Sequence, residues 1–169
     1  MDNSRKVANF ALSKLKQVVT IKTIRNMGLD IFAYRVKHST LKKHNLTSDS
    51  MVLDLYNAYK EDGGNYDAYF RKKWYIITYF QLHHTPRGTH KSTYVVDKSA
   101  IKDFKDLCKD ILTHRGDEDY ANEKLPISTG FINIYDNCYW DSVKDCRNQL
   151  IRLYNSMGNK DIVIWDFSY

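Results

Sequence analysis

The chain has 169 residues, 43% of them hydrophobic and 14% aromatic, which suffices for one core and argues against a disordered protein. Its net charge of +6, with a pI of about 9.1, suits a polyanionic partner, although ordinary surface solvation gives such a balance as well. No run of about 18 apolar residues and no apolar signal-peptide core occurs, so we expect no membrane partner and a cytoplasmic location.

The cysteines indicate the redox environment. Cys108, Cys138 and Cys146 form no Cys-x-x-Cys pair and are odd in number, which favours a reducing compartment without a disulfide framework. Abundant Lys, Asn, Ile and Tyr with two prolines is typical of an AT-rich coding sequence, as in many phages and other viruses. A viral or mobile-element accessory protein acting inside a host cell is therefore one interpretation.

The first half of the chain shows both helical and strand periodicity. Residues 4–28 carry apolar positions at three- and four-residue spacing and predict a basic amphipathic helix. Phe32, Tyr34 and Val36 alternate with Ala33, Arg35 and Lys37 and predict a strand over residues 31–41. A second helix is predicted from a cap at Thr47, Ser48 or Asp49 to the Asp62-Gly63-Gly64 turn, followed by a loop or a helical turn over residues 65–70.

The second half predicts a central hairpin and further alternating elements. The hairpin pairs residues 74–82 with residues 92–96 and reverses at 86–88. A helix from Ser99 to about Gly116 and an exposed acidic loop through Pro126 follow. The chain then continues with a strand over 131–135, a helix from Asp141 or Ser142 to Gly158, and a strand over 162–165. Because helices separate the last three strands, crossovers predict that these strands are parallel. The expected fold is one compact α+β domain over residues 1–169, with a mixed sheet of about five strands covered by about four helices.

Three of the six histidines lie in the predicted hairpin, where His83-His84, a turn, a strand and a helix follow one another. This order resembles in outline the ββα-metal, or HNH-type, nuclease family. The resemblance implies His84 as general base, with His83, Asp97 or His114 as ligands of a divalent metal that polarises a phosphodiester. The chain departs from the family in the helix after the hairpin, which has no early asparagine or histidine.

The triplets His38-Ser39-Thr40 and His83-His84-Thr85 resemble the paired signature of the 2H phosphoesterase family. That resemblance implies His38 and His83 as general acid and base, with Thr40 and Thr85 binding the phosphate. It needs no metal, so the divalent ion is expected only in the nuclease alternative and no other cofactor is expected. Pro86 departs from the hydrophobic residue that follows each triplet in the family.

Binding without catalysis is the interpretation we favour. Aromatic and basic residues interleave over residues 69–75, and such a mixture can stack bases while neutralising phosphates. The expected nucleic-acid contacts are Arg71, Lys72, Lys73, Arg87, His90 and Lys91. The alternatives are a simple polar turn, a phosphodiesterase or nuclease using His38, His83 and His84, and an accessory protein that binds and inhibits an acidic host protein. The sequence leaves open whether the chain is an enzyme, and motifs for nucleoside-triphosphate, dinucleotide or serine-hydrolase chemistry do not occur.

Overall fold

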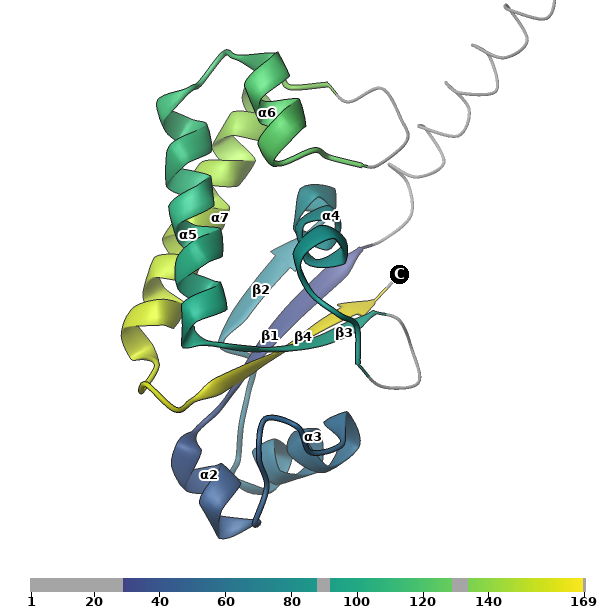
Figure 1. The fold of residues 1–169 in the computed structure, drawn as a ribbon, viewed down its shortest axis with the longest axis vertical. Coiled ribbons are helices and arrows are strands. Elements are labelled where there is room, and N and C mark those ends of the chain that lie inside the picture. Colours follow the sequence, from purple (N-terminus) through teal and green to yellow (C-terminus); the bar gives the residue numbers. More distant parts are fainter. Residues whose placement is uncertain (1–28, 88–91, 129–133, 169) are drawn as a thin grey trace, which may run out of the picture.

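The computed structural model describes residues 29–87, 92–128 and 134–168, and Figure 1 shows their arrangement. The predicted helix over residues 4–28, His90, Lys91 and most of the predicted strand over 131–135 lie outside these ranges. The elements in the described part are β1 (Asp30–Val36), α2 (His38–Lys43), α3 (Val52–Glu61), β2 (Ala68–Arg71), α4 (Trp74–His83), β3 (Thr93–Asp97), α5 (Lys98–Thr113), α6 (Glu118–Lys124), α7 (Asn137–Ser156) and β4 (Ile162–Ser168).

The four described strands form one sheet in the order β2-β1-β4-β3, and every neighbouring pair is antiparallel. The α+β class is confirmed, whereas the prediction of a mixed sheet with parallel strands is wrong. The error arises from the connection between β3 and β4. Helix α5 leads away from the end of β3 and α7 returns to the same side, so β4 starts where β3 ended (Figure 1). Helices α5 and α7, with the short α6 between them, thus act like the turn of a hairpin, whereas one crossover helix would have made the strands parallel.

Residues 74–83 form helix α4, so the predicted strand over residues 74–82 and the hairpin built on it are wrong. All six residues from Tyr75 to Phe80 are buried. The Phe80 ring lies 4.8 Å from that of Trp165 on β4, and the Tyr79 ring stacks at 4.0 Å on that of Phe104 on α5. A helix enclosed by a sheet and by other helices has no polar face. Its sequence therefore lacks the helical period, and its Ile, Thr and aromatic residues suggest a buried strand.

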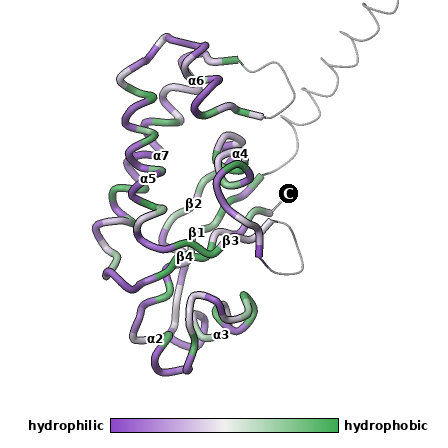
Figure 2. The backbone as a smooth tube through the Cα atoms, viewed as in Figure 1, coloured by the Kyte–Doolittle hydropathy of each residue, from purple (hydrophilic) through white to green (hydrophobic). Residues whose placement is uncertain are grey.

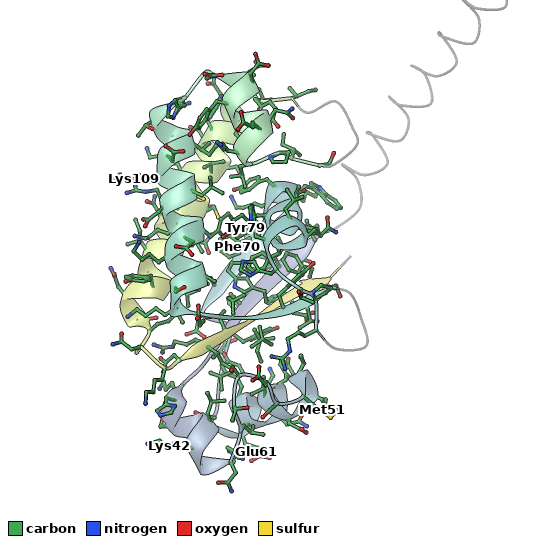
Figure 3. The ribbon with its side chains drawn as sticks, in the orientation of Figure 1. Lys42, Met51, Glu61, Phe70, Tyr79 and Lys109 are labelled. Atoms are coloured by element: carbon green, nitrogen blue, oxygen red, sulfur yellow. The ribbon has the colours of Figure 1, made fainter. Side chains whose placement is uncertain are left out.

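The larger core lies between one face of the sheet and helices α4, α5 and α7. Alternate strand residues such as Ile31, Phe70 and Trp165 point into it, and Figure 3 shows Phe70 and Tyr79 between the sheet and the helices. Helices α5 and α7 each bury one face in this core, Leu107 only in part, as expected for helices of mixed hydrophobic and hydrophilic composition (Figure 2). Cys108 and Cys146 belong to this core and Cys138 is exposed, all three as free thiols.

A smaller core lies on the opposite face of the sheet, under α2 and α3 (Figure 1). Tyr34 and Val36 from β1 and Ile162 and Ile164 from β4 pack there with Leu55 of α3. The predicted helix after Asp49 is confirmed as α3, although its N-cap residue is Met51 and no side chain caps it. Strand β1 ends at Val36 rather than continuing to residue 41, because the chain turns into α2 at His38.

The remaining differences concern short elements. Strand β2 begins in the region over residues 65–70 that was expected to be a loop or a helical turn. The acidic segment forms α6, whose first turn is stabilised by the Asp117 side chain accepting a hydrogen bond from the Tyr120 N–H at 2.9 Å. Helix α7 begins at Asn137 and is capped by Asp136, earlier than predicted, and β4 continues to Ser168. Among the helices of the described ranges, none is both long and apolar enough to cross a bilayer.

Candidate functional site

The two histidine triplets belong to helices on opposite faces of the sheet. His38 opens α2, beside the smaller core, where its backbone N–H donates to the Asp161 carboxylate at 2.9 Å. Thr40 is buried, and its hydroxyl donates to Asp62. His83 ends α4, against the larger core. The sheet separates the two helices (Figure 1), so the described geometry does not bring the triplets together as a phosphoesterase pair requires.

The histidines after α4 differ from each other in environment. His83 is exposed, and its ring lies 4.7 Å from that of Tyr79, while Thr85 is exposed. His84 is half-buried and its Nε2 has no hydrogen-bond partner among the described residues. Burial, and then the neighbouring His83, lower the pKa of His84, although Asp97 and Asp103 oppose this shift. A neutral imidazole is thereby favoured at this position.

His84 lines an open cavity of about 350 Å³ beside strand β3, together with Arg87, Asp97 and the Ser48-Asp49 pair. Arg87 is not a free cation there, because its guanidinium donates to the backbone carbonyls of Ser48 and of Ser50, the latter at 2.9 Å. Asp97 caps α5 by accepting from the Ala100 N–H at 3.0 Å. These groups mainly hold the chain in place, and they leave one histidine to face the cavity.

The geometry offers no metal centre of the nuclease type in the described ranges. Helix α5 has 16 residues, so Asp97 and His114 stand at opposite ends of an element about 24 Å long. The His114 ring stacks on Tyr120 at 4.0 Å. No group of three His, Cys, Asp or Glu side chains among the described residues is placed to hold an ion. With the hairpin replaced by a helix, the outline that suggested a nuclease finger is absent.

The expected basic contacts divide into exposed and engaged residues. Arg71 and Lys72 are exposed at the end of β2, with the Arg71 Nε 3.9 Å from the Asp30 carboxylate. The side chain of Lys73 is 12% exposed and its Nζ lies 3.0 Å from Asp145. Lys73 and Arg87 therefore join parts of the fold, while Arg71 and Lys72 can reach a partner; His90 and Lys91 lie outside the described residues.

The net positive charge of the chain comes from residues 1–28 and Lys91. Of the 26 Lys and Arg residues, six lie in residues 1–28 and one is Lys91, which leaves 19 in the described ranges. Of the 20 Asp and Glu residues, only Asp2 lies in residues 1–28, which also leaves 19. The described part is thus balanced in charge. Its first residue, Leu29, accepts a backbone hydrogen bond from Lys72 at 2.8 Å and so lies beside the end of β2.

The described helices cover the sheet face that carries the smaller core over only half of its length. Its covered rows contain the buried Tyr34, Val36, Ile162 and Ile164. Two further rows on the same face carry side chains that are half-buried or exposed. These rows, which we call the open half-face, are Arg71-Asp30-Ser168 and Tyr69-Phe32-Asp166-Thr93.

Three aromatic rings gather on the open half-face. The Phe32 centroid lies 5.2 Å from that of Tyr69 and 5.8 Å from that of Tyr66, and the two tyrosine centroids are 5.9 Å apart. Tyr66 is 49% exposed. The Tyr69 hydroxyl donates to the Asp30 carboxylate at 2.5 Å, and this hydrogen bond raises the pKa of Tyr69.

Sequence reasoning placed Phe32 on a face with Tyr34 and Val36 and included Tyr69 in the aromatic and basic stretch over residues 69–75. It did not place Tyr69 beside Phe32, and it missed Tyr66. The signal was present: Ala68 and Phe70 alternate with Tyr69 and Arg71, which is the period of a strand. The strand is only four residues long, and so short an alternation is easily overlooked beside the surrounding turns.

Comparisons with family models, curated proteins and solved structures found no match to this chain.

Proposed function

We propose that this protein binds a polyanion, with nucleic acid as the favoured partner, through residues 1–28 together with Arg71 and Lys72. The observation that carries the proposal is the separation of charge. Residues 1–28 hold six basic residues and one acidic residue, whereas the described ranges are balanced. A concentrated positive segment attracts phosphates, whereas the same charge spread evenly over a surface serves mainly solubility.

This surface differs from the one that the sequence suggested. No hairpin presents the central basic residues, because residues 74–83 are helical, and Lys73 and Arg87 are engaged within the fold. Arg71 and Lys72 remain accessible beside Leu29. Residues 1–28 lead directly into Leu29 along the chain, and Leu29 lies beside Arg71 and Lys72. This continuity supports one shared contact region.

The experiment compares two full-length variants with the same net charge. One replaces Lys14, Lys16, Lys22 and Arg25 by Gln. The control replaces Lys42, Lys109, Lys144 and Lys160, which are exposed on α2, α5, α7 and the turn before β4, by Gln (Figure 3 labels Lys42 and Lys109). Affinity for labelled single- and double-stranded DNA and RNA is measured by fluorescence anisotropy over a salt series.

The wild-type protein and the control are expected to bind with affinity that falls linearly in a double-logarithmic plot against salt. The variant in residues 1–28 should lose affinity, and its slope should be shallower by about 0.7–0.9 for each lost phosphate contact. Equal losses in both variants would mean that total charge, rather than this segment, governs binding. No binding by the wild-type protein at low salt would refute the proposal.

Binding to a host protein is the second candidate, and one observation favours it. Met51 and Leu53, at the start of α3, are 70% and 64% exposed. Exposed apolar side chains so close together are common at protein interfaces. A complex formed there should tolerate salt and be weakened by Leu53→Asp, so a salt series in a pull-down experiment separates this candidate from nucleic-acid binding.

A further inference from the structure

We propose that the open half-face binds the unpaired bases of a single-stranded nucleic acid, which stack on Phe32, Tyr66 and Tyr69. This inference rests on the proposed polyanion binding and adds a class of ligand and a place for it. Arg71 and Lys72, at the end of β2, would contact the phosphates, and the three rings would contact the bases.

The rings form a compact platform whose position is set by the sheet. Phe32 and Tyr69 are cross-strand partners on β1 and β2, so the register holds them side by side. Tyr66 precedes β2 and completes the triangle with centroid separations of 5.2 to 5.9 Å. The hydrogen bond from the Tyr69 hydroxyl to the Asp30 carboxylate fixes the orientation of the Tyr69 ring. Rings already held in place lose little conformational entropy when a base stacks on them.

The exposure of this platform is unusual for the sheet to which it belongs. On the opposite face, Ile31, Phe70 and Phe167 of the same strands are buried in the larger core. On its own face, the neighbouring Tyr34 is buried and contacts Tyr56 and Tyr59 of α3 at 5.3 and 5.4 Å. The aromatic cluster therefore extends beyond the region that α3 covers, and Phe32, Tyr66 and Tyr69 form the part that can contact a ligand.

The polar groups on the half-face fit base edges better than they fit an apolar partner. The Asp30 carboxylate, which accepts from the Tyr69 hydroxyl, has further lone pairs that can accept from base N–H groups, and Thr93 and Ser168 carry hydroxyl groups. Arg71 ends the first row, and Lys72, which follows it in the chain, is exposed as well. Aromatic surface, edge-reading polar groups and adjacent positive charge together match the requirements of single-strand binding.

An unpaired strand fits this surface better than a duplex does. Bases in a duplex are already stacked on one another, and reading them requires an element that enters a groove. The half-face belongs to a sheet and presents rings, whose stacking needs bases that are free to leave their neighbours. We therefore expect preference for single strands and little dependence on sequence.

The experiment uses the full chain and three labelled ligands of equal length: a single-stranded oligonucleotide, its duplex, and an abasic strand that has the phosphates without the bases. The wild-type protein should bind the single strand most tightly.

Tyr66→Ala should weaken that binding about tenfold and leave binding of the abasic strand unaffected, while Tyr66→Phe retains affinity. Phe32→Leu keeps an apolar side chain but removes the ring, and it should behave like Tyr66→Ala. Tyr154→Ala, a partly buried tyrosine on α7 beside the larger core, is the matched control and should not change affinity.

A second readout locates the bases directly. Irradiation of a complex with a strand that contains 5-iodouracil should link it to a peptide with Phe32, Tyr66 or Tyr69. Cross-links found only elsewhere would overturn the inference, even if a variant failed to fold.

The outcomes separate this inference from the function on which it rests. Equal affinity for the single strand and the abasic strand, unchanged by Tyr66→Ala, would refute base stacking and leave polyanion binding intact. No binding of any ligand at low salt would refute both. Lower thermal stability of Tyr66→Ala with unchanged affinity would indicate that another part of this chain covers the half-face, and would also overturn the inference.

Discussion

Asp161 joins two segments that are far apart in the sequence. It is 7% exposed and is the buried carboxylate among the described residues. One of its oxygens accepts from the His38 N–H at 2.9 Å and the other from the Gly158 N–H at 2.8 Å. The same side chain therefore closes the turn after α7 and satisfies a backbone donor at the start of α2, where that helix has no side-chain cap of its own.

Replacing Asp161 by Ala should lower the free energy of unfolding by about 1–3 kcal/mol, because two partly buried N–H groups lose their acceptor. Asp161→Asn keeps one acceptor oxygen and should cost less. Urea unfolding followed by far-UV circular dichroism measures both. Asp103→Ala, which removes an exposed carboxylate on α5, is the control and should stay within about 0.5 kcal/mol of wild type. An Asp161→Ala variant as stable as this control would contradict the structural role.

His84 should make stability depend on pH. Burial, and then His83, lower the pKa of His84 from the ordinary 6.5, so the folded protein takes up a proton at lower pH than the unfolded chain does. Above the ordinary pKa both states are neutral at this position and its stabilising effect is fully present. As pH falls through that value the unfolded state is protonated first, so stability decreases until the folded-state pKa is passed.

Replacing His84 by Asn should therefore reduce the loss of stability between about pH 8 and about pH 5. The measurement is the difference in free energy of unfolding at the two pH values for both proteins, which cancels the titration of groups that are common to them. The same pH dependence in wild type and variant would show that His84 does not carry this effect.

At the scale of elements, α4 shows why a buried helix is hard to predict. The helices α3, α5 and α7 were found from sequence because each has one buried face and one hydrated face, which produces the helical period. Helix α4 has buried residues all around its middle, and Ile76, Ile77 and Thr78 have the branched side chains that favour strands. Tertiary packing decides its conformation, and no local pattern carries that information.

Thr78 links α4 to the segment after α6. Its hydroxyl lies 3.0 Å from the Ile127 carbonyl oxygen and 3.4 Å from that of Trp74. Thr78→Val keeps the shape of the side chain but leaves the Ile127 carbonyl without this donor, and should destabilise the protein by about 1 kcal/mol. Thr78→Ser retains the donor and is the matched comparison. Thermal unfolding of the two variants side by side gives the measurement, and a Val variant at least as stable as the Ser variant would contradict the role of this bond.

Neither the direction of the strands nor the open half-face could be predicted, because both depend on how distant segments pair in the folded sheet. Strand direction depends on whether each long helix connects two strands or both α5 and α7 lie between the same two strands. The parallel prediction came from a strand expected over residues 131–135, between these helices, most of which lies outside the described residues. The open half-face needs Tyr69 of β2 beside Phe32 of β1, a pairing that exists only in the folded register. Arg71 and Lys72 were predicted as contacts from the basic run itself, and both are exposed.

At the scale of the whole molecule, the two cores share the same strands. Strand β1 directs Ile31 and Ala33 into the larger core and Tyr34 and Val36 into the smaller one, and β4 alternates likewise. Neither core can lose its strands without exposing the other. We therefore expect the described part of the chain to unfold as one cooperative unit, as predicted for a single domain.

A substitution in the smaller core tests this coupling, because the tryptophans report on the larger one. Trp140 and Trp165 are buried in the larger core and Trp74 packs against it, whereas Leu55 is fully buried in the smaller core. Leu55→Ala should lower the free energy of unfolding by about 2–5 kcal/mol. The shift should be the same by tryptophan fluorescence as by far-UV circular dichroism in urea. Leu53→Ala, on the same helix but 64% exposed, is the control and should shift neither midpoint appreciably.

If Leu55→Ala instead produced an early dichroism transition with an unchanged fluorescence midpoint, α2 and α3 would unfold separately from the rest, and the single-domain prediction would be wrong.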